Sequence, residues 1–120
     1  MGSYGARSLH EQSHGESFLA LFMHRFRTGG LYVLDEPEAA LSPMWQLAFL
    51  RRMHELTRDQ ASQFIVATHS PFLMAYPEAT IYLLSDSGIR SVVYEETEHY
   101  QLARGFFGNR DKVLKELLAD

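Results

Sequence analysis

Apolar and polar residues follow each other along this chain with two different periods, which separate strand-like from helix-like segments. Two short, continuous apolar runs at residues 31–34 and 64–67 are typical of strands that helices cover on both faces. Apolar residues at helical spacing predict helices over residues 15–27 and from about residue 43 to residue 58. The first part of the chain is therefore expected to run helix, strand, helix, strand.

The second part of the chain carries a hairpin pattern followed by two helical patterns. Segments 79–84 and 89–94 are rich in strand-forming residues and flank a polar turn that contains Asp86 and Gly88. We expect this hairpin to form the far edge of the sheet. Apolar residues at helical spacing then predict two terminal helices within residues 97–118, the first capped by Thr97 and the second by Asn109.

This order of elements predicts an α/β fold, a parallel sheet flanked by helices with an edge hairpin. Connections between parallel strands are almost always right-handed crossovers, so the intervening helices pack on the faces of the sheet. A length of 120 residues with 46% hydrophobic residues is enough for one core and short for two. We therefore predict a single domain over residues 1–120.

Composition narrows the classes of function. The net charge is −4 and the sequence has no basic run, so nucleic-acid binding is unsupported, although it is not excluded. The chain has no cysteine, which excludes disulfides and thiolate metal sites and favours an intracellular, cytoplasmic protein. No apolar stretch is long enough to span a bilayer and the start has no signal-peptide pattern, so we expect no membrane span.

Polar residues of the types that bind ligands or take part in catalysis follow both predicted strands of the parallel pair. Asp35 and Glu36 come directly after the first strand, and His69 follows the second. The carboxyl ends of strands in open α/β sheets are where ligands bind. Asp35 is placed to hold Mg²⁺, and Glu36 to orient and deprotonate a water molecule. The alternatives are that Asp-Glu-Pro only ends a strand and that the histidine is structural.

Four segments together resemble the motifs of ABC-type ATPases, including related predicted ATPases without a transmembrane part. Residues 31–36 resemble the Walker B segment and residues 38–41 the D-loop that follows it, so that both motifs fall within residues 31–42. Thr68-His69-Ser70 resembles the switch-histidine loop, within residues 67–71. Ser13-His14-Gly15-Glu16 is similar to the signature motif, which opens a helix here assigned to residues 13–27.

The resemblance implies ATP and Mg²⁺ as cofactors and a second ATPase subunit, either an identical chain or a partner with a P-loop. Ser13, Gly15 and Glu16 would bind the γ-phosphate of nucleotide held by that subunit, since a helix amino terminus attracts anions. His69 would contact the same phosphate and stabilise its charge during the reaction. A glutamate at the position of Glu16 matches the chromosome-maintenance-like branch of the family.

The sequence also departs from the family pattern. His14 stands where a second glycine is usual in the signature, and Ser42 stands where many transporters have aspartate. No segment matches the P-loop pattern G-x-x-x-x-G-K-S/T, and the only lysines are Lys112 and Lys115. The chain therefore resembles the carboxy-terminal half of an ATPase. It is expected to be inactive alone and to expose apolar sheet surface unless another chain covers it.

Two alternatives stay open. The chain is an inactive, truncated relative that binds a complete ATPase, or it is a metal-dependent phosphohydrolase that uses Asp35, Glu36, Glu38 and His69 without a P-loop. Other charged residues are interpreted as surface positions, among them the pair Arg51-Arg52. The remaining histidines show no ligand spacing with one another and are interpreted as surface or amphipathic positions: His10, His24, His54 and His99.

Overall fold

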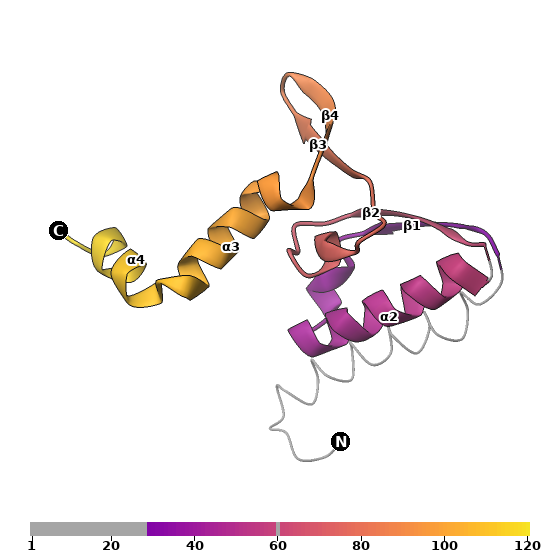
Figure 1. The fold of residues 1–120 in the computed structure, drawn as a ribbon, viewed down its shortest axis with the longest axis horizontal. Coiled ribbons are helices and arrows are strands. Elements are labelled where there is room, and N and C mark those ends of the chain that lie inside the picture. Colours follow the sequence, from indigo (N-terminus) through magenta and orange to yellow (C-terminus); the bar gives the residue numbers. More distant parts are fainter. Residues whose placement is uncertain (1–28, 60) are drawn as a thin grey trace, which may run out of the picture. The chain divides into compact units, whose positions relative to one another are not determined.

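The structure is a computed structural model that describes residues 29–59 and 61–120 (Figure 1). The helix predicted over residues 15–27 lies outside this part of the chain. The chain divides into two compact units, one that extends to Thr68 and one from His69 to Asp120.

The described part of the first unit is a strand–helix–strand unit. Its elements, in order, are β1 (Leu31–Asp35), the short 3₁₀ helix η1 (Pro37–Ala40), α2 (Pro43–Asp59) and β2 (Gln63–Ala67). β1 and β2 pair in parallel, with Leu31 opposite Gln63 and Asp35 opposite Ala67. The parallel pair and the helix between its strands confirm the α/β interpretation of this part of the sequence.

α2 supplies most of the core of the first unit. Phe49, Met53 and Leu56 are buried at helical spacing on one side of α2, and Leu41 is buried in the segment before it. The strand residues that alternate toward one face are half-buried, and the rings of Tyr32 and Phe64 lie 5.1 Å apart. Figure 1 shows α2 running along the strands, as expected for a crossover helix.

The opposite face of the parallel pair is exposed. Leu31, Val33 and Ile65 alternate toward this face, and Val33 has 69% of its surface accessible. The prediction that both faces of these strands are covered is therefore wrong for the described structure. Continuous apolar runs indicate two-sided burial, but here one helix covers only one side.

The second unit consists of a hairpin and two helices. Its elements are η2 (Leu73–Ala75), β3 (Ile81–Ser85), β4 (Gly88–Val92), η3 (Tyr94–Glu96), α3 (Glu98–Gly108) and α4 (Arg110–Leu117). Ser85 pairs with Gly88, so a two-residue turn joins the strands, and Gly88 adopts φ +123°, a conformation that favours glycine. The predicted hairpin is confirmed.

The hairpin does not extend the parallel sheet. The described strands form two separate two-stranded sheets, β1 with β2 and β3 with β4. The prediction that the hairpin is the far edge of one sheet is therefore wrong. β3 and β4 are joined by a tight turn and form their backbone hydrogen bonds with each other. Among the described residues, no hydrogen-bond ladder links them to β1 or β2.

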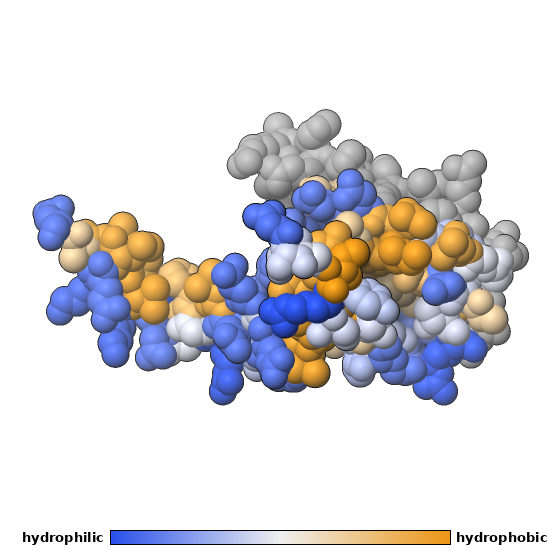
Figure 2. Space-filling view, turned by 90° about the horizontal axis from the view of Figure 1, so that it is seen from above, coloured by the Kyte–Doolittle hydropathy of each residue, from blue (hydrophilic) through white to orange (hydrophobic). Residues whose placement is uncertain are grey.

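The two terminal helices lie where the sequence predicts them. Thr97 caps α3, because its Oγ1 accepts a hydrogen bond from the Tyr100 backbone N–H at 3.1 Å. Asn109 occupies the cap position of α4 but makes no side-chain cap bond, so that part of the prediction is wrong. Figure 2 shows apolar side chains over α3 and α4, where Leu102, Phe107 and Leu117 are exposed.

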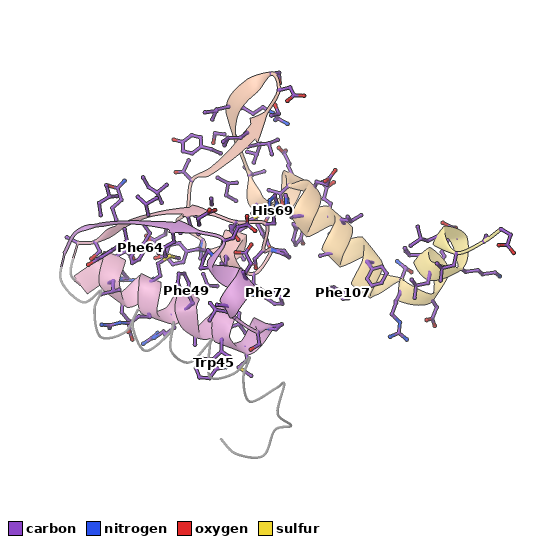
Figure 3. The ribbon with its side chains drawn as sticks, turned by 180° about the vertical axis from the view of Figure 1, so that it is seen from behind. Trp45, Phe49, Phe64, His69, Phe72 and Phe107 are labelled. Atoms are coloured by element: carbon purple, nitrogen blue, oxygen red, sulfur yellow. The ribbon has the colours of Figure 1, made fainter. Side chains whose placement is uncertain are left out.

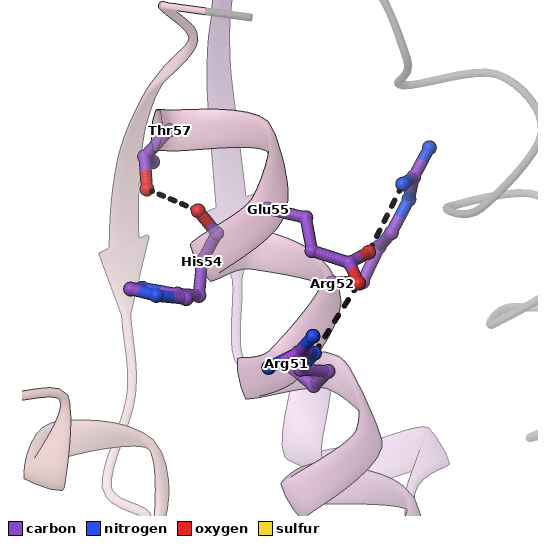
Figure 4. Close-up of polar contacts among 5 residues, drawn as sticks. All are labelled: Arg51, Arg52, His54, Glu55 and Thr57. Atoms are coloured by element: carbon purple, nitrogen blue, oxygen red, sulfur yellow. Dashed lines mark hydrogen bonds and ion pairs between the residues drawn. The ribbon is translucent and has the colours of Figure 1, made fainter. Parts of the chain in front are cut away.

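The charged residues of α2 form a surface cluster (Figure 4). Glu55 pairs with both Arg51 and Arg52 at 3.2 Å. The hydrogen bond from Arg52 and the charge of Arg51 hold the pKa of Glu55 below its ordinary value. The Arg51 side chain is 75% exposed and that of Arg52 only 18%, so the predicted solvated face is wrong for Arg52.

None of the helices in the described ranges has the length and apolarity that crossing a membrane requires.

Candidate functional site

The two adjacent carboxylates lie at the carboxyl end of β1. Asp35 is the last residue of the strand and stands opposite Ala67, the last residue of β2. The Glu36 backbone N–H donates to the Ala67 carbonyl oxygen at 2.7 Å, which adds one more bond beyond the strand ladder. Both acidic residues are exposed, so water solvates their charges. The predicted position of this pair at the strand end is confirmed.

Glu36 has an unusual backbone conformation. Its φ of 48° and ψ of 55° lie in the left-handed region, which non-glycine residues adopt at a cost of about 1–3 kcal/mol. Pro37 follows and disfavours the right-handed helical region at the residue before it. Glu36 thus leaves the extended conformation of β1, so the alternation of the strand does not set the direction of its side chain. Such strained residues cluster at functional sites.

A side-chain hydrogen bond joins the segments that follow the two strands. The Thr68 Oγ1 donates to the Glu38 Oε1 at 2.6 Å, and both residues are half-buried. Glu38 belongs to η1, which follows β1, whereas Thr68 directly follows β2. The bond spans thirty residues of sequence and closes the carboxyl end of the parallel pair. The first unit therefore gathers Asp35, Glu36, Glu38 and Thr68 at one edge.

His69 is paired with a residue that the sequence analysis set aside. Its Nδ1 lies 3.1 Å from Nε2 of His99, which belongs to the first turn of α3 (Figure 3 labels His69). His99 is half-buried, which agrees with an amphipathic position, but its contact with His69 was not predicted. The sequence held no signal for this contact, because thirty residues separate the two histidines and no motif includes His99.

Further hydrogen bonds hold the segment that begins with His69. Ser70 is buried, and its Oγ accepts from the backbone N–H groups of Phe72 and Leu73 at 3.2 and 3.3 Å. The Tyr94 hydroxyl donates to the Pro71 carbonyl oxygen at 2.7 Å. Burial raises the pKa of Tyr94 above its ordinary value, and the nearby Tyr100 and Glu95 raise it further. This segment is thus bound to residues just before and within α3.

The side chains of the described residues indicate which kind of metal site the carboxyl end of β1 can form. No group of three or more histidine, aspartate or glutamate side chains in residues 29–59 and 61–120 is arranged to hold a metal ion. Mg²⁺ in nucleotide sites is bound by one or two carboxylates together with phosphates and water. The Asp35 carboxylate, exposed at the strand end, fits that kind of site better than a site made of protein ligands alone.

Three of the predicted binding residues, Ser13, Gly15 and Glu16, lie outside the described residues. Asp35 and Glu36 belong to the first unit and His69 to the second. Their convergence on a common ligand stays a prediction.

Comparison with known proteins gives a match over the first part of the chain. Residues 1–75 match the model of a family described as "AAA domain, putative AbiEii toxin, Type IV TA system". The match covers both strands of the parallel pair, the acidic pair and His69. No curated protein and no solved structure matches the chain.

Proposed function

This chain belongs to the AAA-domain family whose model it matches, and on that basis we propose that it forms part of a Mg²⁺-dependent ATP-hydrolysing site of the ABC type. The family supports a nucleotide-binding, ATPase-like function. We propose the nucleotide chemistry of the family for this chain and not the toxin activity in the family's description. The reason is that the residues at the strand ends are of the types that bind Mg²⁺ and phosphate.

One observation carries the proposal: the arrangement at the carboxyl end of the parallel pair. Asp35 ends β1, Glu36 is held in a strained conformation by a bond to Ala67, and Glu38 is bonded to Thr68. A loop that only ends a strand needs neither two adjacent carboxylates nor a left-handed glutamate. A site that must direct a carboxylate at a water molecule has a use for both.

The proposed roles follow from the position and chemistry of each side chain. Asp35 would hold Mg²⁺, which neutralises charge on the phosphates when it is bound. Glu36 would accept a proton from the attacking water. His69 would donate a hydrogen bond to the γ-phosphate. Ser13, Gly15 and Glu16, at the start of the predicted signature helix, would bind the phosphate of nucleotide on a second subunit.

The phosphate cradle has to come from outside these 120 residues. The sequence has no P-loop pattern, and both of its lysines, Lys112 and Lys115, lie in α4. The exposed apolar face formed by Leu31, Val33 and Ile65 is the kind of surface that another part of an ATPase domain, or a partner, covers. We therefore propose that the active site is completed by a P-loop-bearing polypeptide.

The test is a reconstitution. We expect the purified chain alone to show no ATP turnover, and to show Mg²⁺-dependent turnover when it is combined with a P-loop-bearing protein of the same family. Glu36→Gln should reduce that turnover by about 10²–10⁴-fold, the usual contribution of a general base. Glu116→Gln, at an exposed position on α4, is the matched control and should leave turnover unchanged.

The same assay separates the alternatives. If the chain binds a complete ATPase and Glu36→Gln changes nothing, the chain is an inactive binding module. A metal-dependent phosphohydrolase requires tight metal binding without nucleotide, which titration calorimetry with Mn²⁺ would detect.

A further inference from the structure

The two histidine rings meet end to end rather than face to face. Their centroids are 5.3 Å apart, their planes differ by 29°, and the facing nitrogens are 3.1 Å apart. The centroid separation exceeds the distance between the nitrogens by about the sum of two ring radii, so the nitrogens lie close to the line that joins the ring centres. This is the in-line geometry of an N–H···N hydrogen bond, and it has room for a single proton.

We propose that His99 is a positioning residue for His69, an inference that rests on the proposed ATPase function. The hydrogen bond engages Nδ1 of His69, so the proposed contact with phosphate would be made by Nε2. A neutral His69 whose Nδ1 accepts the proton of His99 carries its own hydrogen on Nε2. That tautomer donates to a phosphate oxygen, whereas the opposite tautomer presents a lone pair that a phosphate repels.

His99 can hold the ring in this way because both partners are anchored. His99 lies in the first turn of α3, directly after Glu98 and the cap residue Thr97. The hydroxyl of Tyr94 binds the carbonyl of Pro71, two residues after His69. The rings of Tyr94 and Tyr100 lie 4.7 Å apart. Two bonds therefore join the segment after β2 to the segment around the start of α3.

The first experiment uses the full chain without nucleotide. With ¹⁵N-labelled histidine, we expect a scalar coupling across the hydrogen bond between His69 Nδ1 and His99 Nε2, and an unprotonated Nδ1 on His69. His99→Leu should abolish the coupling and move the His69 nitrogen shifts toward those of a free imidazole. His99→Gln should keep Nδ1 of His69 hydrogen-bonded, because its amide nitrogen can replace Nε2. His54→Gln, on α2, is the matched control.

The second experiment measures ATP turnover in the reconstituted ATPase. His99→Leu should lower kcat about tenfold with little change in KM. Losses of about this size are usual when a residue that orients a metal-binding histidine through a hydrogen bond is removed. His99→Gln should recover most of that loss, and His54→Gln should have no effect. A loss of kcat that glutamine does not recover would indicate a structural role and would overturn the proposal.

The two readouts fail separately. A protonated Nδ1 on His69, or shifts that His99→Leu leaves unchanged, would overturn the positioning role whatever the enzyme does. A normal histidine pair in a reconstituted enzyme that is insensitive to Glu36→Gln would refute the ATPase function. In that case the hydrogen bond would stand as a structural fact without the proposed role.

Discussion

The two units of this chain are stabilised by different kinds of interaction. In the described part of the first, Leu41, Phe49, Met53 and Leu56 are buried on or next to one helix, and Phe49 and Leu56 have no accessible surface. In the described second unit, Leu73 is the one buried apolar side chain, and the apolar residues of the hairpin and the last two helices are largely exposed. The second unit is held mainly by hydrogen bonds within turns, caps and the hairpin ladder.

This difference shows how far local signals can build structure without a core. A capped helix and a tight hairpin each satisfy their own backbone groups, so they form from nearby residues. Apolar burial supplies most of the stability of a folded domain, and here it is concentrated around α2. We expect the two units to respond differently to the same kind of substitution.

The largest expected difference comes from removing one aromatic ring in each unit. Phe49→Ala leaves a cavity in the first unit and should lower its free energy of unfolding by about 3–5 kcal/mol. Phe107→Ala, at a side chain that is 76% exposed, should change stability by less than about 0.5 kcal/mol. Urea unfolding followed by the fluorescence of Trp45, the single tryptophan, measures the first unit, and hydrogen exchange at the amides of α3 measures the second. Similar effects of the two substitutions would remove the contrast.

A smaller effect is expected from the cap of α3. Thr97→Ala removes the acceptor of the Tyr100 N–H and should destabilise the helix by about 1 kcal/mol. The loss should appear as faster hydrogen exchange at the Tyr100 amide, with no change in the Trp45 unfolding midpoint. Thr80→Ala, at an exposed position before β3, is the control. A shift of the Trp45 midpoint with Thr97→Ala would show that the two units unfold together.

The units also differ in how they accommodate positive φ angles. The hairpin of the second unit places glycine there, whereas the first unit has Glu36 and Ala61 at φ of 48° and 54°. Ala61→Gly and Glu36→Gly should each raise the stability of the first unit by roughly 0.5–1 kcal/mol, because they relieve strain. Only Glu36→Gly should also abolish reconstituted ATP turnover. Thermal melting with the turnover assay checks this pair, and a loss of stability in both variants would show that neither backbone is strained.

The smallest expected effect is a pH dependence on the surface of α2. The paired arginines hold the pKa of Glu55 below its value in the unfolded chain, so its contribution is present above the unfolded pKa. That contribution is lost as the pH falls through the lowered folded-state pKa. Glu55→Gln should flatten this acidic dependence in the first unit, whereas Glu116→Gln should not. Unfolding midpoints between neutral and acidic pH measure it, and identical profiles for the parent and Glu55→Gln would contradict it.

Much of the local structure of this protein could be predicted from its sequence. The apolar runs predicted β1 and β2, helical spacing predicted α2, α3 and α4, and Asp86 and Gly88 marked the hairpin turn. The position of Asp35 and Glu36 at the end of β1 followed from Pro37, which cannot continue a strand ladder. These features depend on neighbours in sequence, and so the sequence alone determined them.

Tertiary structure decided the features that depend on residues far apart in the chain. The Glu38–Thr68 bond and the His69–His99 pair each span thirty residues, and no local period encodes them. The exposure of Val33 depends on how many layers surround a strand. Apolar residues on a strand face indicate only that the face can be buried. Long-range packing decides whether another element covers it.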